Sequence, residues 1–293
     1  MRLRMLIPAA LACLPGLSGC QAGRLAHHPR TETAGSPAIV SAPSKYSLRV
    51  SQFIFLADRE LQATMPLFQD LARLREQVRK ELELPENNRL IQVYVFEDRE
   101  RYERYMHGRY PDLPKRRAFF VAQPRSLGGE EDLLVYTFWG ERVRQDLRHE
   151  LTHALLHGVL KDVPLWLDEG LAEFFEAPAE WRGVHYPHLD QIRLAADEPF
   201  QPNLARLEQV SQVHQMTPAD YREAWAWVHL LLRGKPEGKA ILLDYLRDLR
   251  TNPVPGPLSA RLPAVYLSPH ETLRVHLAQL ENGIRPASAL HKP

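Results

Sequence analysis

The segment His149-Glu-Leu-Thr-His153 places the strongest restriction on how this chain can fold. On an α-helix, positions i and i+4 lie on one face about 6 Å apart along the axis, so both imidazoles can meet one metal ion. Glu150 is rotated by about 100° from His149, where its carboxylate can reach a water on the metal without displacing a ligand. The segment therefore predicts a helix that carries two nitrogen ligands and a base.

A catalytic zinc ion needs a third protein ligand and an open fourth position. His157 continues the series, but on an unbroken helix it lies about 12 Å from His149, too far to share the ion. We interpret it as a packing or helix-terminal residue. The segment Pro164-Leu-Trp-Leu-Asp-Glu-Gly-Leu-Ala-Glu-Phe-Phe-Glu176 predicts a second helix with Glu169 and Glu173 one turn apart on one face.

His-Glu-x-x-His followed by Trp-Leu-x-Glu-Gly-x-Ala-Glu resembles the gluzincin zinc metallopeptidases, in particular the peptidase MA-like domains related to the thermolysin and aminopeptidase N groups. The resemblance covers residues 145–176 most firmly. It implies that Glu169, the Glu that precedes Gly, is the third zinc ligand, and that Glu173 supports His149 from behind. By its spacing from His153 alone, Glu173 fits the thermolysin pattern better, but the Asp-Glu-Gly context favours Glu169.

The same resemblance implies zinc as the cofactor and hydrolysis of a peptide bond as the reaction. Zinc held by His149, His153 and Glu169 would lower the pKa of a bound water and polarise the scissile carbonyl. Glu150 takes the water proton and delivers it to the leaving amine. The substrate is therefore expected to be a peptide or protein, without a distinction between endopeptidase and exopeptidase action.

Gluzincins add a Tyr or His that steadies the tetrahedral oxyanion. Our first candidate for this catalytic role is Tyr221, with Tyr186 and His229 as alternatives. The strand expected over residues 133–138 precedes the first metal helix. The resemblance implies that it is the sheet edge along which an extended peptide pairs by main-chain hydrogen bonds.

The N-terminal segment has the layout of a secretory signal: arginines, an apolar stretch and small residues. Its end, Leu17-Ser-Gly-Cys20, resembles the bacterial lipobox, which implies cleavage after residue 19 and a lipid on Cys20. Cys13 then leaves with the signal, so the mature chain has no free thiol. Residues 20–45 lack apolar periodicity and predict a flexible tether.

These features predict a protein in the cell envelope, attached to the membrane through the lipid. By resemblance to lipoprotein sorting, the absence of Asp at position 21 favours the periplasmic face of the outer membrane. With 37 Lys and Arg against 36 Asp and Glu, the 293-residue chain lacks the basic excess of a nucleic-acid binder. No nucleic-acid partner is expected, and the sequence does not predict an oligomeric state.

Hydrophobic periodicity predicts strands mixed with helices before Gly140 and mostly helices after it, which indicates an α+β fold. The resemblance implies that this fold is zincin-like. The expected strands are 46–56, 90–96, 118–122 and 133–138, and the expected helices are 61–82, 98–107, 142–159, 165–176, 188–196, 220–233, 237–250 and 270–281. The expected division is 1–19 signal peptide, 20–45 tether, 46–180 zincin-like α/β part with the metal site, 181–285 helical subdomain and 286–293 tail.

Two functions from different classes fit these patterns. The first is a zinc peptidase of the cell envelope, and the alternative is a non-catalytic zincin-like lipoprotein that acts as a structural or peptide-binding scaffold. A general base in addition to the metal ligands favours the enzyme, because a structural zinc site needs no base and is usually closed by a fourth protein ligand.

Overall fold

A mixed β-sheet organises the N-terminal half of the protein in this computed structural model, which describes residues 40–125, 129–160, 162–194, 200–252, 254–281 and 285. The strands are β1 (Tyr46–Val50), β2 (Phe53–Ala57), β3 (Ile91–Phe96), β4 (Ala118–Gln123) and β5 (Asp132–Phe138). Within the described residues they form a five-stranded sheet of order β1-β2-β3-β5-β4. Strands β2, β3 and β5 run parallel, and β1 and β4 are antiparallel to their neighbours.

Two expectations about the strands were wrong. The single strand expected over 46–56 is a hairpin, because Ser51 adopts a φ of 56° and turns the chain between β1 and β2. The strand expected to form the edge beside the metal helix, β5, is instead internal, since it pairs with β3 on one side and β4 on the other. The edge strand next to the metal helix is β4.

Helices α1 and α2 lie between strands of the sheet, and the other helices of the described chain follow β5. They are α1 (Pro66–Glu81), α2 (Arg99–Arg109), α3 (Val143–His157), α4 (Leu165–Glu176), α5 (Tyr186–Leu194), α6 (Leu204–Leu207), α7 (Pro218–Arg233), α8 (Pro236–Thr251) and α9 (Pro269–Glu281), with 3₁₀ turns at Ala179–Trp181, Val213–Gln215 and Leu258–Ala264. Helix α1 starts at Pro66, five residues later than the expected 61, because proline suits the first helical position and cannot donate inside a helix.

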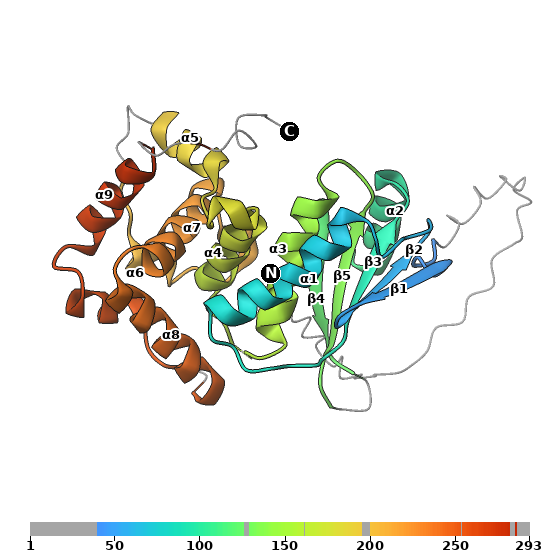
Figure 1. The fold of residues 1–293 in the computed structure, drawn as a ribbon, viewed down its shortest axis with the longest axis horizontal. Helices are drawn as coiled ribbons and strands as arrows, with labels where there is room; N and C mark the ends of the chain where they lie inside the picture. The colour runs from blue at the N-terminus through green and yellow to red at the C-terminus, as the bar shows by residue number, and fades with distance from the viewer. Residues whose placement is uncertain are drawn as a thin grey trace, which may run out of the picture.

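The sheet is covered on both faces, with α1 and α3 on one side and α2 on the other (Figure 1). Successive side chains of a strand point to opposite faces. In β4, Phe120 therefore packs into the core with α3, whereas Phe119 packs with Tyr102 and Met106 of α2. Both faces of β4 are buried while one of its edges has no strand partner among the described residues.

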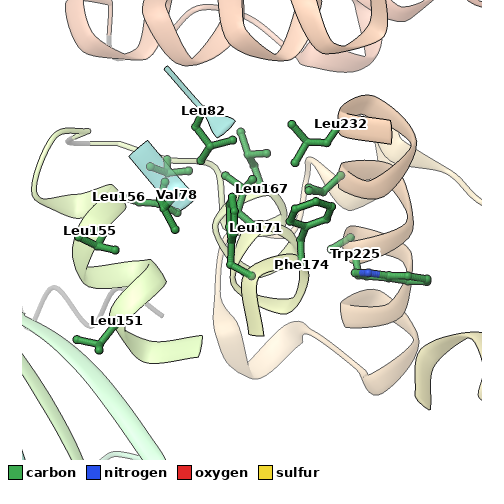
Figure 2. Packing of buried hydrophobic residues seen from close by; sticks show 14 of the residues in the cluster. Val78, Leu82, Leu151, Leu155, Leu156, Leu167, Leu171, Phe174, Trp225 and Leu232 are labelled. Carbon is green, nitrogen blue, oxygen red and sulfur yellow. The ribbon is translucent and has the colours of Figure 1, made fainter. Parts of the chain in front are cut away.

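Helix α4 lies at the centre of the molecule, between α3 on the sheet side and α7 on the helical side (Figure 1). Figure 2 shows its side chains Leu167, Leu171 and Phe174 between buried residues of the neighbouring helices, including Leu156 on one side and Trp225 on the other. The apolar core therefore runs without interruption from the sheet into the helices. The architecture is α+β, as the sequence indicated, and the boundary at 180/181 stays a prediction.

Several expectations concern residues outside the described part of the chain: the signal peptide at 1–19, the lipidation site Cys20, most of the 20–45 tether and the 286–293 tail. Among the helices that the structure describes, none combines the length and apolar character needed to cross a membrane.

Candidate metal centre

Helix α3 carries His149 and His153 on the side that meets α4, and Glu150 directly follows His149. Its Leu147 and Leu151 are fully buried against the sheet and hold the helix in place. The two imidazole rings lie 5.0 Å apart between centroids, as the i, i+4 spacing requires. The His153 side chain is 1% exposed and that of His149 is 14% exposed, so the pair reaches from the interior to the surface.

Helix α4 brings Glu169 to these histidines. Its Oε2 lies 3.5 Å from Nε2 of His149 and 3.6 Å from Nε2 of His153, and the side chain is fully buried. The next residue, Gly170, lets α4 approach α7 closely, since a Cβ at this position would lie 2.6 Å from the carbonyl oxygen of Ala224. The structure therefore brings together the three residues that the sequence nominated as metal ligands.

The donor atoms have the spacing that zinc requires. Ligand atoms at about 2.0–2.1 Å from a tetrahedral zinc ion lie about 3.4 Å from one another. The two nitrogen-to-oxygen distances of 3.5 Å and 3.6 Å match this value. Two imidazole nitrogens and one carboxylate oxygen are also a known donor set of catalytic zinc sites, in which a fourth coordination position stays open. The residues present fit a catalytic zinc ion.

The far nitrogens of both histidines are held by carboxylates of α4. Nδ1 of His149 lies 2.9 Å from Oε2 of Glu176, and Nδ1 of His153 lies 3.1 Å from Oδ1 of Asp168. Glu176 accepts a hydrogen bond from Nδ1–H of His149, so Nε2 of that ring is left as a lone-pair donor toward Glu169. For His153, Asp168 places a carboxylate oxygen on the same Nδ1 side of the ring, and Nε2 again faces Glu169. Glu176 thus selects the tautomer of His149 that a metal needs.

Asp168 is shared between two histidines, since its Oδ2 lies 2.8 Å from Nε2 of His157. Burial raises the pKa of Asp168, but the charges of His157 and His153 outweigh it and hold this pKa well below its usual range. His157 also stacks on Phe120 of β4, with 5.3 Å between ring centroids. It therefore lies outside the donor group and acts as a packing residue that also orients Asp168.

Glu173 occupies a different place from the one expected. The resemblance implied that it supports His149, but its Oε2 lies 3.0 Å from Nε2 of His188, and Glu176 takes the expected position. Both glutamates, with Glu169, project from one face of α4 at steps of four and three residues. The same helical periodicity could have indicated Glu176 from the sequence. Glu176 was missed because the family motif ends at Glu173.

His185 and His188 were not singled out from the sequence. Nδ1 of His185 accepts the backbone N–H of His188 at the start of α5, which leaves Nε2 as the protonated nitrogen. That nitrogen lies 3.4 Å from Glu173 and 3.4 Å from Glu176. His185 thus helps to fix the carboxylate that holds His149.

Tyr221, on the first turn of α7, lies on the same face as Ala224, which contacts Gly170 beside Glu169. Burial and then the charge of Glu169 raise its pKa, so its hydroxyl is protonated at neutral pH. Its oxygen accepts a hydrogen bond of 2.7 Å from Arg116, a residue that the sequence did not single out.

The two alternative candidates for the oxyanion role have other partners. His229 pairs with His276 at 2.8 Å, and Tyr186 packs on Trp181. Tyr221 differs from these two residues because the charge of Glu169, a candidate metal ligand, contributes to its raised pKa.

Comparisons with known proteins add the following findings. A family model described as "Protein of unknown function (DUF1570)" matches residues 145–254, which run from α3 to the loop after α8. No curated protein matches the chain. Among solved structures, the crystal structure of an M1 zinc metallopeptidase from Deinococcus radiodurans is similar, with a TM-score of 0.44 and 17% identity over 81% of this chain and 51% of that one. This chain thus spans about half the length of that protein.

Proposed function

We propose that the protein is a zinc-dependent peptidase. The observation that carries the proposal is the arrangement of Nε2 of His149, Nε2 of His153 and Oε2 of Glu169 at zinc-ligand spacing, with each Nδ1 held by a carboxylate. Bound there, zinc would supply a Lewis acid that polarises the scissile carbonyl and acidifies water. The same arrangement leaves a coordination position for substrate, which a structural zinc site usually lacks.

Glu150 supplies the proton transfers. It is 8% exposed and adjoins His149 on α3, so its carboxylate borders the metal centre from the side. In hydrolysis, the carbonyl carbon gains the hydroxyl of one water molecule and the C–N bond breaks. Glu150 takes the other proton of that water and passes it to the departing nitrogen. One carboxylate thereby serves both halves of the reaction.

Tyr221 is suited to stabilise the oxyanion that develops on the carbonyl oxygen. Because Arg116 donates to its oxygen, the Tyr221 proton is directed elsewhere and can be donated to a developing negative charge. The raised pKa keeps that proton in place at neutral pH. Strand β4 contacts α3, and its edge that has no strand partner among the described residues offers main-chain groups to an extended peptide.

The proposal includes the cell envelope as the site of action, through a lipid on Cys20 that the sequence predicts. Incorporation of a fatty-acid analogue into the wild-type protein, with its loss in a Cys20→Ser variant, is the measurement that tests this part. Incorporation that persists in the variant would remove Cys20 from its role.

The central test is Glu150→Gln. We expect the variant to retain about one zinc ion per chain while peptide hydrolysis falls by at least about 100-fold, since general acid–base catalysis contributes at least that much. Glu141→Gln is a matched control, because Glu141 is exposed just before the same helix. Metal content and turnover of a peptide library are measured in parallel.

The alternative is a non-catalytic zincin-like scaffold. It predicts one zinc ion per wild-type chain without hydrolysis of any peptide, and no difference between the wild type and Glu150→Gln. If Glu150→Gln hydrolyses peptides as fast as the wild type does, the protein is a peptidase but Glu150 is not its general base.

A further inference from the structure

Arg116 is a cation beside the proposed active site, and no ion pair of its guanidinium is found among the described residues. It lies two residues before β4 and is partly buried, and its single hydrogen bond among the described residues goes to the Tyr221 hydroxyl. No carboxylate of the described residues lies within ion-pair distance of it. A guanidinium offers five N–H donors in a planar fork that matches a carboxylate, and buried cations are normally paired. Most of this donor capacity is available to a ligand.

The position of Arg116 relative to the metal centre follows from Tyr221. The tyrosine oxygen lies 2.7 Å from the Arg116 guanidinium, and Tyr221 is one helical turn from the Ala224 contact with Gly170. Burial lowers the pKa of Arg116, but Tyr221 and Glu169 raise this pKa by more than burial lowers it. The guanidinium therefore remains a cation. The guanidinium is therefore within about one peptide residue of the proposed oxyanion site.

A cavity of about 340 Å³ adjoins Arg116, at the lower end of the size range of small-molecule sites. Besides Arg116, its walls include the aromatic or apolar Tyr102, Met106, Tyr110 and Phe119 and also the polar or charged Glu103, Arg104, His107 and Lys115, so an apolar part of the lining lies beside a mainly basic one. The Tyr102 hydroxyl in its wall is buried and has no hydrogen-bond partner in the part of the chain that the structure describes, so it is available to a polar group in the cavity. Such a cavity fits an apolar side chain next to an anionic group.

The strand direction of β4 decides which end of a peptide meets this cation. A peptide paired antiparallel to β4 runs its carboxyl end toward the N-terminal end of the strand, where Arg116 lies. A peptide paired in parallel would bring its amino end there and place an ammonium group against a guanidinium, which is repulsive. Charge therefore selects the carboxyl end.

We propose that Arg116 binds the free α-carboxylate of a peptide substrate, with the C-terminal side chain in the adjoining cavity. This inference rests on the proposed peptidase function and narrows it to a carboxypeptidase that prefers apolar or aromatic C-terminal residues. Each turnover adds one water across the last peptide bond. The products are a free amino acid and a shortened peptide with a new carboxylate.

The test compares two N-acetylated Ala-Ala-Phe peptides, one with a free carboxylate and one with a C-terminal amide. We expect the zinc-loaded wild type to cleave the acid with a kcat/KM at least about 100-fold above that of the amide, since the amide loses a charge-assisted pair. Arg116→Gln should reduce this ratio to near one by slowing cleavage of the acid. Arg116→Lys, which keeps the charge but not the fork, should be intermediate.

Arg125→Gln is the matched control. Arg125 is an exposed arginine beyond the other end of β4, paired with Asp132, and its loss removes the same charge without altering the proposed site. We expect this variant to keep the full preference for the acid. Thermal melting and zinc content identify any Arg116 variant that fails to fold, in which case the acid-to-amide ratio of the wild type still decides the question.

A binding measurement separates this inference from the peptidase proposal. Zinc-loaded Glu150→Gln enzyme is titrated with both peptides by calorimetry, and we expect the acid to bind at least about 10-fold more tightly than the amide. If the wild type cleaves nothing but this preference is present and Arg116-dependent, the peptidase proposal fails and carboxylate binding stands. Equal binding of the two peptides, absence of binding, or equal cleavage of amide and acid would overturn the carboxylate inference.

Discussion

Glu176 is the residue on which the orientation of His149 depends. Its two carboxylate oxygens accept from three side chains: His149 at 2.9 Å, His185 at 3.4 Å and the Gln145 amide. Burial raises the pKa of Glu176, but these histidine partners outweigh it and hold the pKa well below its usual range. An ionised carboxylate at this position fixes the His149 ring without coordinating the metal itself.

We predict that Glu176→Gln weakens zinc binding by about 10- to 100-fold, the usual effect of removing a carboxylate behind a metal histidine. Glu173→Gln is the matched comparison, because Glu173 lies on the same face of α4 but pairs with His188. Competition with a chromophoric chelator measures both affinities. A larger loss for Glu173→Gln than for Glu176→Gln would restore the assignment that the sequence resemblance implied.

The proposed ligands could be nominated from the sequence because their spacing is local. His149 and His153 are four residues apart on one helix, and Glu169 lies in a short segment with its own motif. The roles of Asp168 and Arg116 could not be nominated in this way. Asp168 joins two histidines of another helix, and Arg116 meets a tyrosine 105 residues away, so both depend on how distant segments pack.

At the level of elements, the metal centre depends on the closeness of α4 and α7. The backbone of Gly170 contacts α7 directly, and Glu169 immediately precedes this contact. Because both helices are otherwise lined by buried apolar side chains, neither can move away without opening a cavity. Gly170 thus couples the packing of the helical half to the position of a metal ligand.

We predict that Gly170→Ala destabilises the protein by about 1–3 kcal/mol, a typical result of overpacking, and also weakens zinc binding. The added Cβ would meet the Ala224 oxygen at 2.6 Å and the Val228 side chain at 2.9 Å, and neither neighbour can move freely. Gly108→Ala in α2 is the control, since a Cβ there meets nothing within 4 Å.

Urea unfolding and chelator competition measure both effects in the two variants. The control should be neutral or slightly stabilising, because alanine favours a helix more than glycine does. If Gly170→Ala lowers stability without changing zinc affinity, the inferred coupling between helix packing and Glu169 is wrong.

Helix bounds could be read from the sequence better than strand pairing. Helix α4 runs over the expected 165–176, because Pro164 marks its start and the apolar positions follow a helical period. The position of β4 at the edge of the sheet, beside β5, could not be predicted from the sequence. The order of strands in a sheet depends on contacts between segments that are far apart in the chain. The turn at Ser51 was also missed, because an apolar and β-rich run continues on both sides of it.

At the scale of the whole molecule, contacts outside the metal centre also join the parts of the fold. Glu81 at the end of α1 binds Arg233 of α7 at 2.9 Å and Lys239 of α8 at 2.7 Å. Further along, the His229–His276 pair links α7 to α9. The metal centre lies between α3 and α4, where the sheet side meets the helical side, so its geometry depends on the stability of the complete fold.

The His229–His276 pair predicts a pH dependence of stability that is separate from the metal ligands. Burial lowers the pKa of His276 to about 4. Burial, then the charges of His276, Arg233 and Arg182, hold the pKa of His229 well below 6.5. Because both folded pKa values lie below the unfolded value of about 6.5, the unfolded chain binds more protons as the pH falls. The contribution of this pair to the free energy of unfolding is therefore fully present above pH ~6.5 and is lost as the pH falls toward ~4.

We predict that the free energy of unfolding falls by about 1–2 kcal/mol more between pH 7 and pH 5 in the wild type than in His276→Gln, which lacks one of the two titrating groups. Urea unfolding at fixed zinc concentration measures the difference, and comparison of the two proteins cancels the titration of the metal centre. His107→Gln is the control for the loss of a histidine, because His107 is exposed on α2 and lies outside the His229–His276 pair. An equal pH dependence in His276→Gln and the wild type would mean that this histidine pair does not contribute to the acid sensitivity of the fold.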